Sequence, residues 1–129
     1  MTKKCLYLST AVIAMTVVFA GTPAPLHAQQ APAVSIGDTD LGGVVRGPNG
    51  PEAGVWVIAE TNDLPTKMVK IVVTDDQGRY VVPDLPKANY TLWVRGYGLV
   101  DSPKVMTVPG KIVNLTALPA PNDAAAAEY

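Results

Sequence analysis

Short apolar runs separated by turn-forming residues dominate residues 41–117, and no stretch there keeps a helical period. Such runs, rich in β-branched residues and bounded by glycine, proline, asparagine and aspartate, are typical of β-strands. Seven of them at close intervals predict an all-β sandwich. The expected strands are residues 41–46, 55–60, 67–74, 79–82, 89–95, 104–108 and 112–117.

The connection at residues 75–78, Asp-Asp-Gln-Gly, is short and ends on a glycine. Gly78 can adopt the positive φ that a tight turn requires. A short connection of this kind is typical of a β-hairpin. We therefore expect the strands at residues 67–74 and 79–82 to pair with each other.

The aspartates of this connection have two interpretations. Together with Asp84, the carboxylates of Asp75 and Asp76 could supply oxygen ligands for calcium. A turn can use the same aspartates to cap its own backbone amides. The sequence lacks a spaced ligand loop, so the second interpretation is favoured and no metal site is expected.

Residues 1–28 have the three parts of an export signal. Lys3 and Lys4 precede an apolar run at residues 5–20, and residues 26–28, Leu-His-Ala, are a plausible cleavage site. The run is shorter than the roughly 20 residues that a membrane-spanning helix needs. We expect this segment to be removed, with no stable membrane span afterwards and a periplasmic or extracellular location.

The rest of the chain divides into three parts. Residues 29–40 have little periodicity and are expected to form a flexible tether. Residues 118–129 contain two prolines, and their alanine run is too short for a stable isolated helix, so a disordered tail is expected. A single domain at residues 41–117 lies between them.

Cysteine and histidine each occur once, as Cys5 and His27, and both lie in the expected export signal. The exported domain would therefore have no disulfide and no zinc site built from these residues. Catalysis by a serine–histidine or cysteine–histidine pair is excluded for the same reason. We expect no cofactor and no enzymatic activity.

The charge balance excludes another class of protein. The chain has 10 basic and 11 acidic residues, which gives a formal net charge of -1. Proteins that bind nucleic acids need a basic patch or stripe to offset the phosphate charge. We therefore expect no nucleic-acid partner.

Alternation along the strands assigns side chains to faces, because successive residues of a strand point to opposite sides. In the fifth expected strand Arg95 prefers water, so Trp93 on the same side should also point outward. In the second, Glu60 marks the outer side, which Trp56 and Ile58 share. The opposite, core-facing sides consist of Val55, Val57 and Ala59 in the second strand and Tyr90, Leu92 and Val94 in the fifth.

The third expected strand is apolar on both sides. Val69, Ile71 and Val73 form one side, and Lys70 shares the other side with two apolar residues. The sequence leaves open which of these sides faces the core.

Three segments follow a recognisable order and spacing. They are Val45-Arg46-Gly47-Pro48-Asn49-Gly50-Pro51 with Ala53-Gly54-Val55-Trp56-Val57, then Thr74-Asp75-Asp76-Gln77-Gly78-Arg79-Tyr80, and then Leu85-Pro86 with Tyr90-Thr91-Leu92-Trp93-Val94 and Gly96-Tyr97. Together they resemble the opening, central turn and closing segment of carboxypeptidase regulatory-like domains. Ala88 departs from the pattern, because the family usually has glycine before the tyrosine-containing strand.

The resemblance implies a seven-stranded Greek-key β-sandwich of the transthyretin-like (prealbumin-like) type, in the same broad fold group as carbohydrate-binding modules. It also implies that the second and fifth strands are neighbours. Domains of this family are usually non-catalytic structural or binding modules, so the family name does not imply peptidase activity.

The outward-facing aromatic residues are the strongest candidates for a binding site. Leaving two tryptophans exposed forgoes apolar burial of roughly 2–3 kcal/mol each, and contiguous exposed apolar patches usually mark interfaces. We expect a secreted accessory module that binds a protein or a carbohydrate. The expected binding face consists of Trp56, Ile58 and Trp93, with Arg95 and Glu60 as its polar rim.

Two other classes of function are weighed against this one. The first is a structural protein that self-associates, or joins a larger envelope assembly, which would make the chain an oligomer. The second is a hydrolase accessory, which rests on the family name alone. The outer aromatic residues could also be covered by loops or tails, in which case the face would bind nothing.

Overall fold

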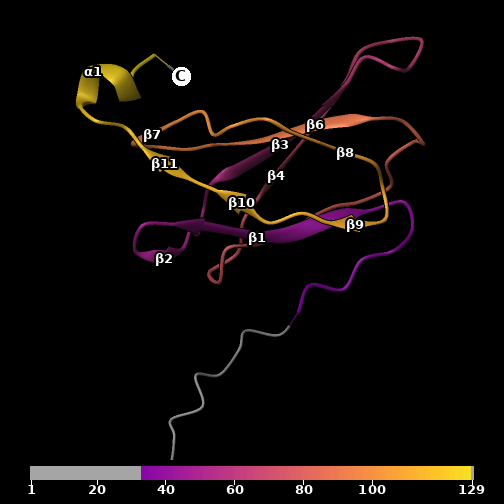
Figure 1. The fold of residues 1–129 in the computed structure, drawn as a ribbon, viewed down its shortest axis with the longest axis horizontal. Helices are drawn as coiled ribbons and strands as arrows, with labels where there is room; N and C mark the ends of the chain where they lie inside the picture. Colours follow the sequence, from indigo (N-terminus) through magenta and orange to yellow (C-terminus); the bar gives the residue numbers. More distant parts are fainter. Residues whose placement is uncertain (1–32, 129) are drawn as a thin grey trace, which may run out of the picture.

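The computed structural model describes residues 33–128, so the expected export signal at residues 1–28 lies outside the described residues. The all-β prediction is confirmed, and two open sheets form two layers that are consistent with a β-sandwich (Figure 1). The elements in chain order are β1 (Leu41–Gly47), β2 (Gly50–Pro51), β3 (Trp56–Thr61), β4 (Met68–Val73), β5 (Arg79–Val82), β6 (Tyr90–Arg95), β7 (Leu99–Val100), β8 (Val105–Thr107), β9 (Lys111–Ile112), β10 (Leu115–Thr116), β11 (Leu118–Pro119) and α1 (Asp123–Ala126).

The two layers have different pairing patterns. In the first sheet β1 is the centre: it pairs antiparallel with β2 and β5 and parallel with β9 and β10. The second sheet is antiparallel throughout and has the order β4-β3-β6-β8. The strands β7 and β11 form a small antiparallel ribbon. Figure 1 shows the second sheet above the first.

Each expected strand region contains at least one strand, but the last region is broken into β9 and β10. The break lies where the backbone of Val113 passes Gly43. A Cβ atom on Gly43 would lie 1.9 Å from the Val113 carbonyl oxygen. At this break a side chain takes the place of a backbone acceptor: Asn114 Oδ1 accepts a hydrogen bond from the backbone N–H of Val44 at 3.0 Å.

The expected hairpin between the third and fourth predicted strands is wrong. β4 pairs with β3 in the second sheet, and β5 pairs with β1 in the first, so residues 75–78 connect the two layers. The turn itself has the expected conformation, with Gly78 at φ 72°. Turn residues fix the local backbone, whereas the choice of strand partner depends on which faces become buried.

Asp75 caps backbone amides of its own turn, as the favoured interpretation of residues 75–78 predicted. Its Oδ1 accepts hydrogen bonds from the backbone N–H groups of Gln77 and Arg79, each at 2.9 Å. Its Oδ2 accepts one from the Arg79 side chain at 2.7 Å. Within residues 33–128, no cluster of three or more potential metal-binding side chains is present.

The core lies between the two layers and draws on both. It includes two tyrosines whose hydroxyl groups find backbone partners: Tyr80 donates to the Val113 carbonyl at 2.6 Å, and Tyr90 donates to the Pro86 carbonyl at 2.8 Å. Burial raises the pKa of both phenols. The buried core residues are Leu41, Val45, Val55, Val57, Ala59, Tyr80, Val82, Leu85, Tyr90, Leu92, Val94, Leu99, Leu115 and Ala117.

The part of the expected tether that the structure describes, residues 33–40, lies against β1. The Val34 and Ile36 side chains cover Gly42, where an added Cβ atom would lie 3.1 and 2.5 Å from them. The Thr39 carbonyl accepts a hydrogen bond from the Leu85 backbone N–H at 2.8 Å. This segment therefore contributes to the outside of the first sheet.

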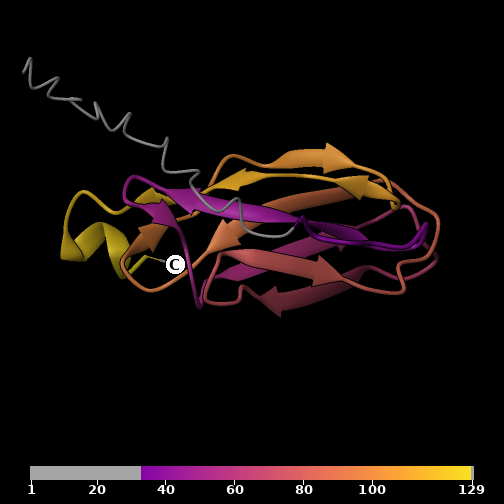
Figure 2. The ribbon, with the colours of Figure 1, turned by 90° about the horizontal axis from the view of Figure 1, so that it is seen from below.

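The expected C-terminal tail also contains regular structure. β11 pairs with β7, and α1 begins after Asn122, whose Oδ1 accepts a hydrogen bond from the Ala125 backbone N–H at 2.9 Å. This cap and the pairing of β11 support a helix that would be too short to persist alone. Figure 2 shows α1 beyond one end of the two layers. No helix in the described range is long and apolar enough to cross a membrane.

Candidate functional site

The outer face is defined here as the side of the second sheet that points away from the core. β3 and β6 are neighbours, as the resemblance implied. The register pairs Trp56 with Arg95, Ile58 with Trp93 and Glu60 with Thr91 on this face. The alternate residues of β3 and β6 belong to the core. All five predicted site residues therefore share one face, as expected, and Trp56 and Trp93 are diagonal neighbours.

Trp56, Ile58 and Trp93 were all expected to be exposed to solvent, and this prediction is correct only for Trp56. Trp56 is 49% exposed, but Ile58 and Trp93 are only 5% and 7% exposed. Ile58 and Trp93 form the central pair of a four-stranded sheet, so neighbouring side chains on the same face surround and cover them. They stabilise the outer face instead of presenting a free surface.

Lys104 covers part of the Trp93 ring. Its Nζ atom lies 4.5 Å from the centre of the indole ring, within the range of a cation–π contact. The Trp93 Nε1 atom is buried and has no hydrogen-bond partner among the described residues. An unpaired buried N–H group disfavours the folded state by roughly 1–3 kcal/mol, so packing and the cation–π contact must offset that cost.

The open question about the third predicted strand is resolved by its register with β3. Val69, Ile71 and Val73 lie opposite Glu60, Ile58 and Trp56, so they belong to the outer face. Their exposed fractions are 45%, 56% and 57%. The alternate residues Met68 and Val72 pack against the core.

The polar rim of the outer face consists of ion pairs. Lys67 Nζ lies 2.6 Å from Glu60 Oε1. Arg95 and Asp101 form a two-pronged pair, with 2.7 Å between Nε and Oδ1 and 2.6 Å between Nη2 and Oδ2. The second pair holds the planar guanidinium group of Arg95 in a fixed orientation at the end of β6.

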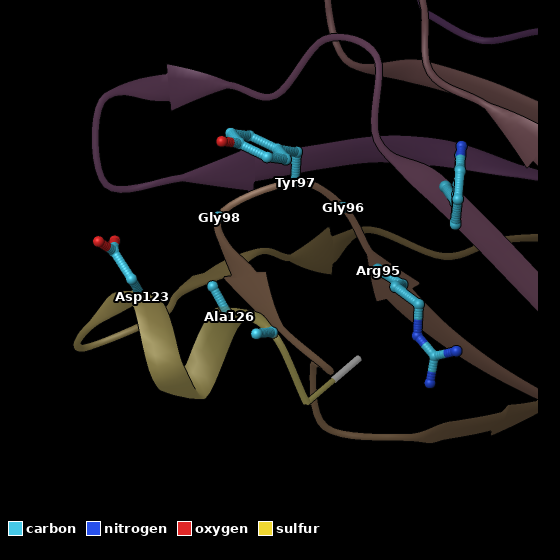
Figure 3. A pocket seen from close by; sticks show the side chains of 8 residues that line it. Arg95, Gly96, Tyr97, Gly98, Asp123 and Ala126 are labelled. Atoms are coloured by element: carbon cyan, nitrogen blue, oxygen red, sulfur yellow. The ribbon is translucent and has the colours of Figure 1, made fainter.

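A cleft of about 570 Å³ opens where β3 and β6 meet the C-terminal helix. Its volume is within the range of small-molecule binding sites. Trp56 and Tyr97 supply exposed aromatic surface, and Tyr97 is fully exposed. In the close-up, Tyr97 and α1, with Asp123 and Ala126, flank Gly98, while Arg95 lies further along (Figure 3). The lining residues are Trp56, Arg95, Gly96, Tyr97, Gly98, Asp123, Ala126 and Ala127.

Local packing explains why this cleft forms. A side chain on Gly96 would lie 3.0 Å from both Leu99 and Val55, so glycine lets the turn pack tightly against the core. Gly98 has a φ of 71°, which favours glycine. Tyr97 is thereby held at the tip of a tight turn. The Gly98 carbonyl accepts a hydrogen bond from the Ala120 backbone N–H at 2.9 Å, which brings α1 beside it.

Six of the eight lining residues were not predicted as site residues, and two of these six, Tyr97 and Asp123, carry side chains suited to binding a ligand. Tyr97 lies between two glycines, and this Gly-Tyr-Gly pattern is the signal that could have identified an exposed aromatic residue at a turn. Asp123 carried no such signal, because only the pairing of β11 with β7 brings α1 to this place. The predicted residues Ile58, Trp93 and Glu60 do not line the cleft.

The lining of the cleft combines two aromatic side chains, Trp56 and Tyr97, with two charged ones, Arg95 and Asp123. Aromatic side chains bind the apolar faces of ring-shaped ligands, and carboxylate and guanidinium groups bind hydroxyl groups at their edges. A scan against protein-family models finds no model that matches this chain, and a search of curated proteins finds no significant relative. The resemblance to carboxypeptidase regulatory-like domains therefore stays a prediction.

Proposed function

We propose that this chain is a non-enzymatic binding module that holds a carbohydrate in the cleft between Trp56 and Tyr97. The observation that carries the proposal is the presence of two exposed aromatic side chains on one hollow, beside a fixed guanidinium group and a carboxylate. A sugar ring could stack on one or both aromatic side chains. Its hydroxyl groups could then bind Arg95 and Asp123.

The absence of a catalytic role is part of the same proposal. The only cysteine and histidine in the sequence are Cys5 and His27, and both lie in the segment expected to be removed on export. Without them, a serine or threonine hydroxyl lacks the usual imidazole base that would activate it. An exported module of this kind would act in the periplasm or outside the cell.

The finer fold assignment also belongs to this proposal. Treating β9 and β10 as one interrupted strand leaves seven main strands: β1, β3, β4, β5, β6, β8 and the β9–β10 strand. Their number and the two-layer arrangement support a Greek-key sandwich of the transthyretin-like type, and hence membership of the carboxypeptidase regulatory-like family. Non-catalytic modules that bind proteins or carbohydrates are usual in that family.

The two tryptophans allow a matched test of the binding site. The Trp93→Phe variant keeps only Trp56 as a fluorophore, at the cleft, whereas Trp56→Phe keeps only Trp93, which is covered. The probes are cellohexaose, xylohexaose and a soluble peptidoglycan fragment. A ligand in the cleft should shift the emission of the Trp93→Phe variant in a saturable way. It should leave that of Trp56→Phe nearly unchanged.

Calorimetry on the unmodified protein and on Tyr97→Ala provides the second measurement. Tyr97 is fully exposed, so its removal should leave folding intact while it weakens binding. Equal affinities for both proteins, or no response to any of the three glycans, would refute the carbohydrate proposal. If a periplasmic protein binds the unmodified chain but not Tyr97→Ala, the cleft is instead a protein-binding site.

A further inference from the structure

β4 is an edge strand with an exposed β-branched surface. Among the described residues 33–128 it pairs only with β3, so its other side has no strand partner in that range. Its outer row consists of Val69, Ile71 and Val73, each roughly half exposed. Unpaired strand edges of this composition favour pairing with another strand.

The one charge within this edge strand is directed away from the open side. Lysine on an edge strand usually discourages association with another chain. Here Lys70 shares the inner side with Met68 and Val72, and its Nζ atom donates hydrogen bonds to the Pro83 carbonyl at 2.6 Å and the Asp84 carbonyl at 3.0 Å. The ammonium group is therefore hydrogen-bonded to the segment that follows β5 and does not lie on the outer face beside Val69 and Ile71.

We propose that β4 pairs antiparallel with β4 of a second copy of this chain, about a twofold axis through Ile71. A twofold axis makes both copies contribute the same surface, so the strand must be complementary to itself. With Ile71 opposite the partner's Ile71, Val69 lies opposite the partner's Val73 on the outer face. Cross-strand pairs of β-branched residues stabilise such a ladder.

Charge selects this register over the alternative in which Lys70 occupies the axis. Centring on Lys70 would place two ammonium groups opposite each other, which is destabilising. Centring on Ile71 places Lys70 opposite the partner's Val72. At both ends it also brings Lys67, which pairs with Glu60, to the level of the partner's Asp75, which pairs with Arg79, so side chains of opposite charge lie near each other at each end. The joined sheet would have eight strands, with β8 at each outer edge.

Sedimentation velocity of the purified protein over a wide concentration range tests the association. A reversible monomer–dimer equilibrium is expected. Ile71→Lys should raise the dimer dissociation constant by roughly tenfold or more, because it places like charges on the axis. Ile112→Lys is the matched control: Ile112 is 52% exposed, against 56% for Ile71, and lies on β9 in the other sheet. A protein that stays monomeric at all concentrations, or a dimer that both variants weaken equally, would overturn the proposal.

Cysteine substitution tests the register without destabilising the interface. In a Cys5→Ser background, Ile71→Cys should form a disulfide-linked dimer on mild oxidation, because directly opposed residues have Cα atoms about 4.5–5.5 Å apart. Val69→Cys should not, because the two copies of that residue would lie four positions apart along the strands, roughly 13 Å. Efficient linkage through residue 69 with none through residue 71 would overturn the Ile71-centred pairing. Circular dichroism of each variant checks that the fold is retained.

Discussion

Ile58 and Trp93 lie opposite each other on β3 and β6, and both are buried although they point away from the core. The outer face of the second sheet is thus a second, smaller apolar cluster with its own cover. Lys104 lies over the indole of Trp93 and is the cover whose removal is easiest to test. Of the two tryptophans on this face, only Trp56, at the edge of the cluster, stays exposed.

Replacing Lys104 by glutamine should lower the free energy of unfolding by about 0.5–1 kcal/mol, because it removes the cation from the indole face. Urea unfolding followed by circular dichroism measures this change. The control is Lys111→Gln, an exposed lysine on β9, for which a change below about 0.5 kcal/mol is expected. Equal effects of the two substitutions would show that the contact with Trp93 contributes nothing.

Thr74 joins two backbone groups that have no strand partner. Its hydroxyl group accepts from the Val55 backbone N–H at 3.1 Å and donates to the Glu52 carbonyl at 2.7 Å. Thr74→Val keeps the shape but removes both bonds, and it should cost about 1–3 kcal/mol of stability. Thr74→Ser keeps the hydroxyl group and should lose less. If both variants unfold at the same denaturant concentration, the hydrogen bonds are not the cause.

Two glycines of β1 should respond differently to alanine. At Gly43 the new methyl group would meet the Val113 backbone at 1.9 Å, which cannot move without shifting β9 and β10. At Gly47 it would meet the carboxylate end of the Glu52 side chain, also at 1.9 Å, which can rotate away. Gly43→Ala should therefore cost about 1–3 kcal/mol or more, and Gly47→Ala clearly less. The melting temperature of each variant measures the loss of stability. A larger decrease for Gly47→Ala than for Gly43→Ala would contradict the close approach of Val113 to Gly43.

Acid should destabilise the fold through three aspartates in turns and loops. Hydrogen bonds lower the carboxyl pKa in each case, chiefly from the Gly37 amide to Asp40, from the Asn89 side chain to Asp63 and from the Arg79 amide to Asp75. Because the folded-state pKa values are lowered, this stabilisation is complete above the unfolded value of about 4 and is lost as the pH falls through the folded values.

Melting temperature measured against pH tests this expectation. It should change little between about pH 5 and 8 and then fall below about pH 4. In Asp75→Asn the fall should be smaller, because one of the three titrating groups is gone. If the melting temperature of Asp75→Asn falls as steeply with acid as that of the unmodified protein, protonation of Asp75 does not contribute to the acid destabilisation.

The sequence determined the main strands and the sidedness of the second sheet, but not the short strands β2, β7 and β11 or the helix α1. Alternation of apolar and charged residues marked Trp56, Ile58 and Trp93 as outward-facing, since a strand places successive side chains on opposite sides. It also identified the capped turn at Asp75. These features depend on residues close together in the chain, where local geometry leaves few alternatives.

Only the tertiary structure decided which strands pair and which outward side chains stay exposed. The turn at residues 75–78 is compatible with a hairpin and with a crossing between sheets, and burial of both β4 and β5 against the core favours the crossing. Trp93 is covered in part by Lys104, which lies in the segment just before β8 and reaches Trp93 because β8 pairs with β6. The cleft depends on β7 and β11, which bring α1 beside Tyr97. Such long-range contacts are set by the summed packing of the whole domain, which local patterns do not contain.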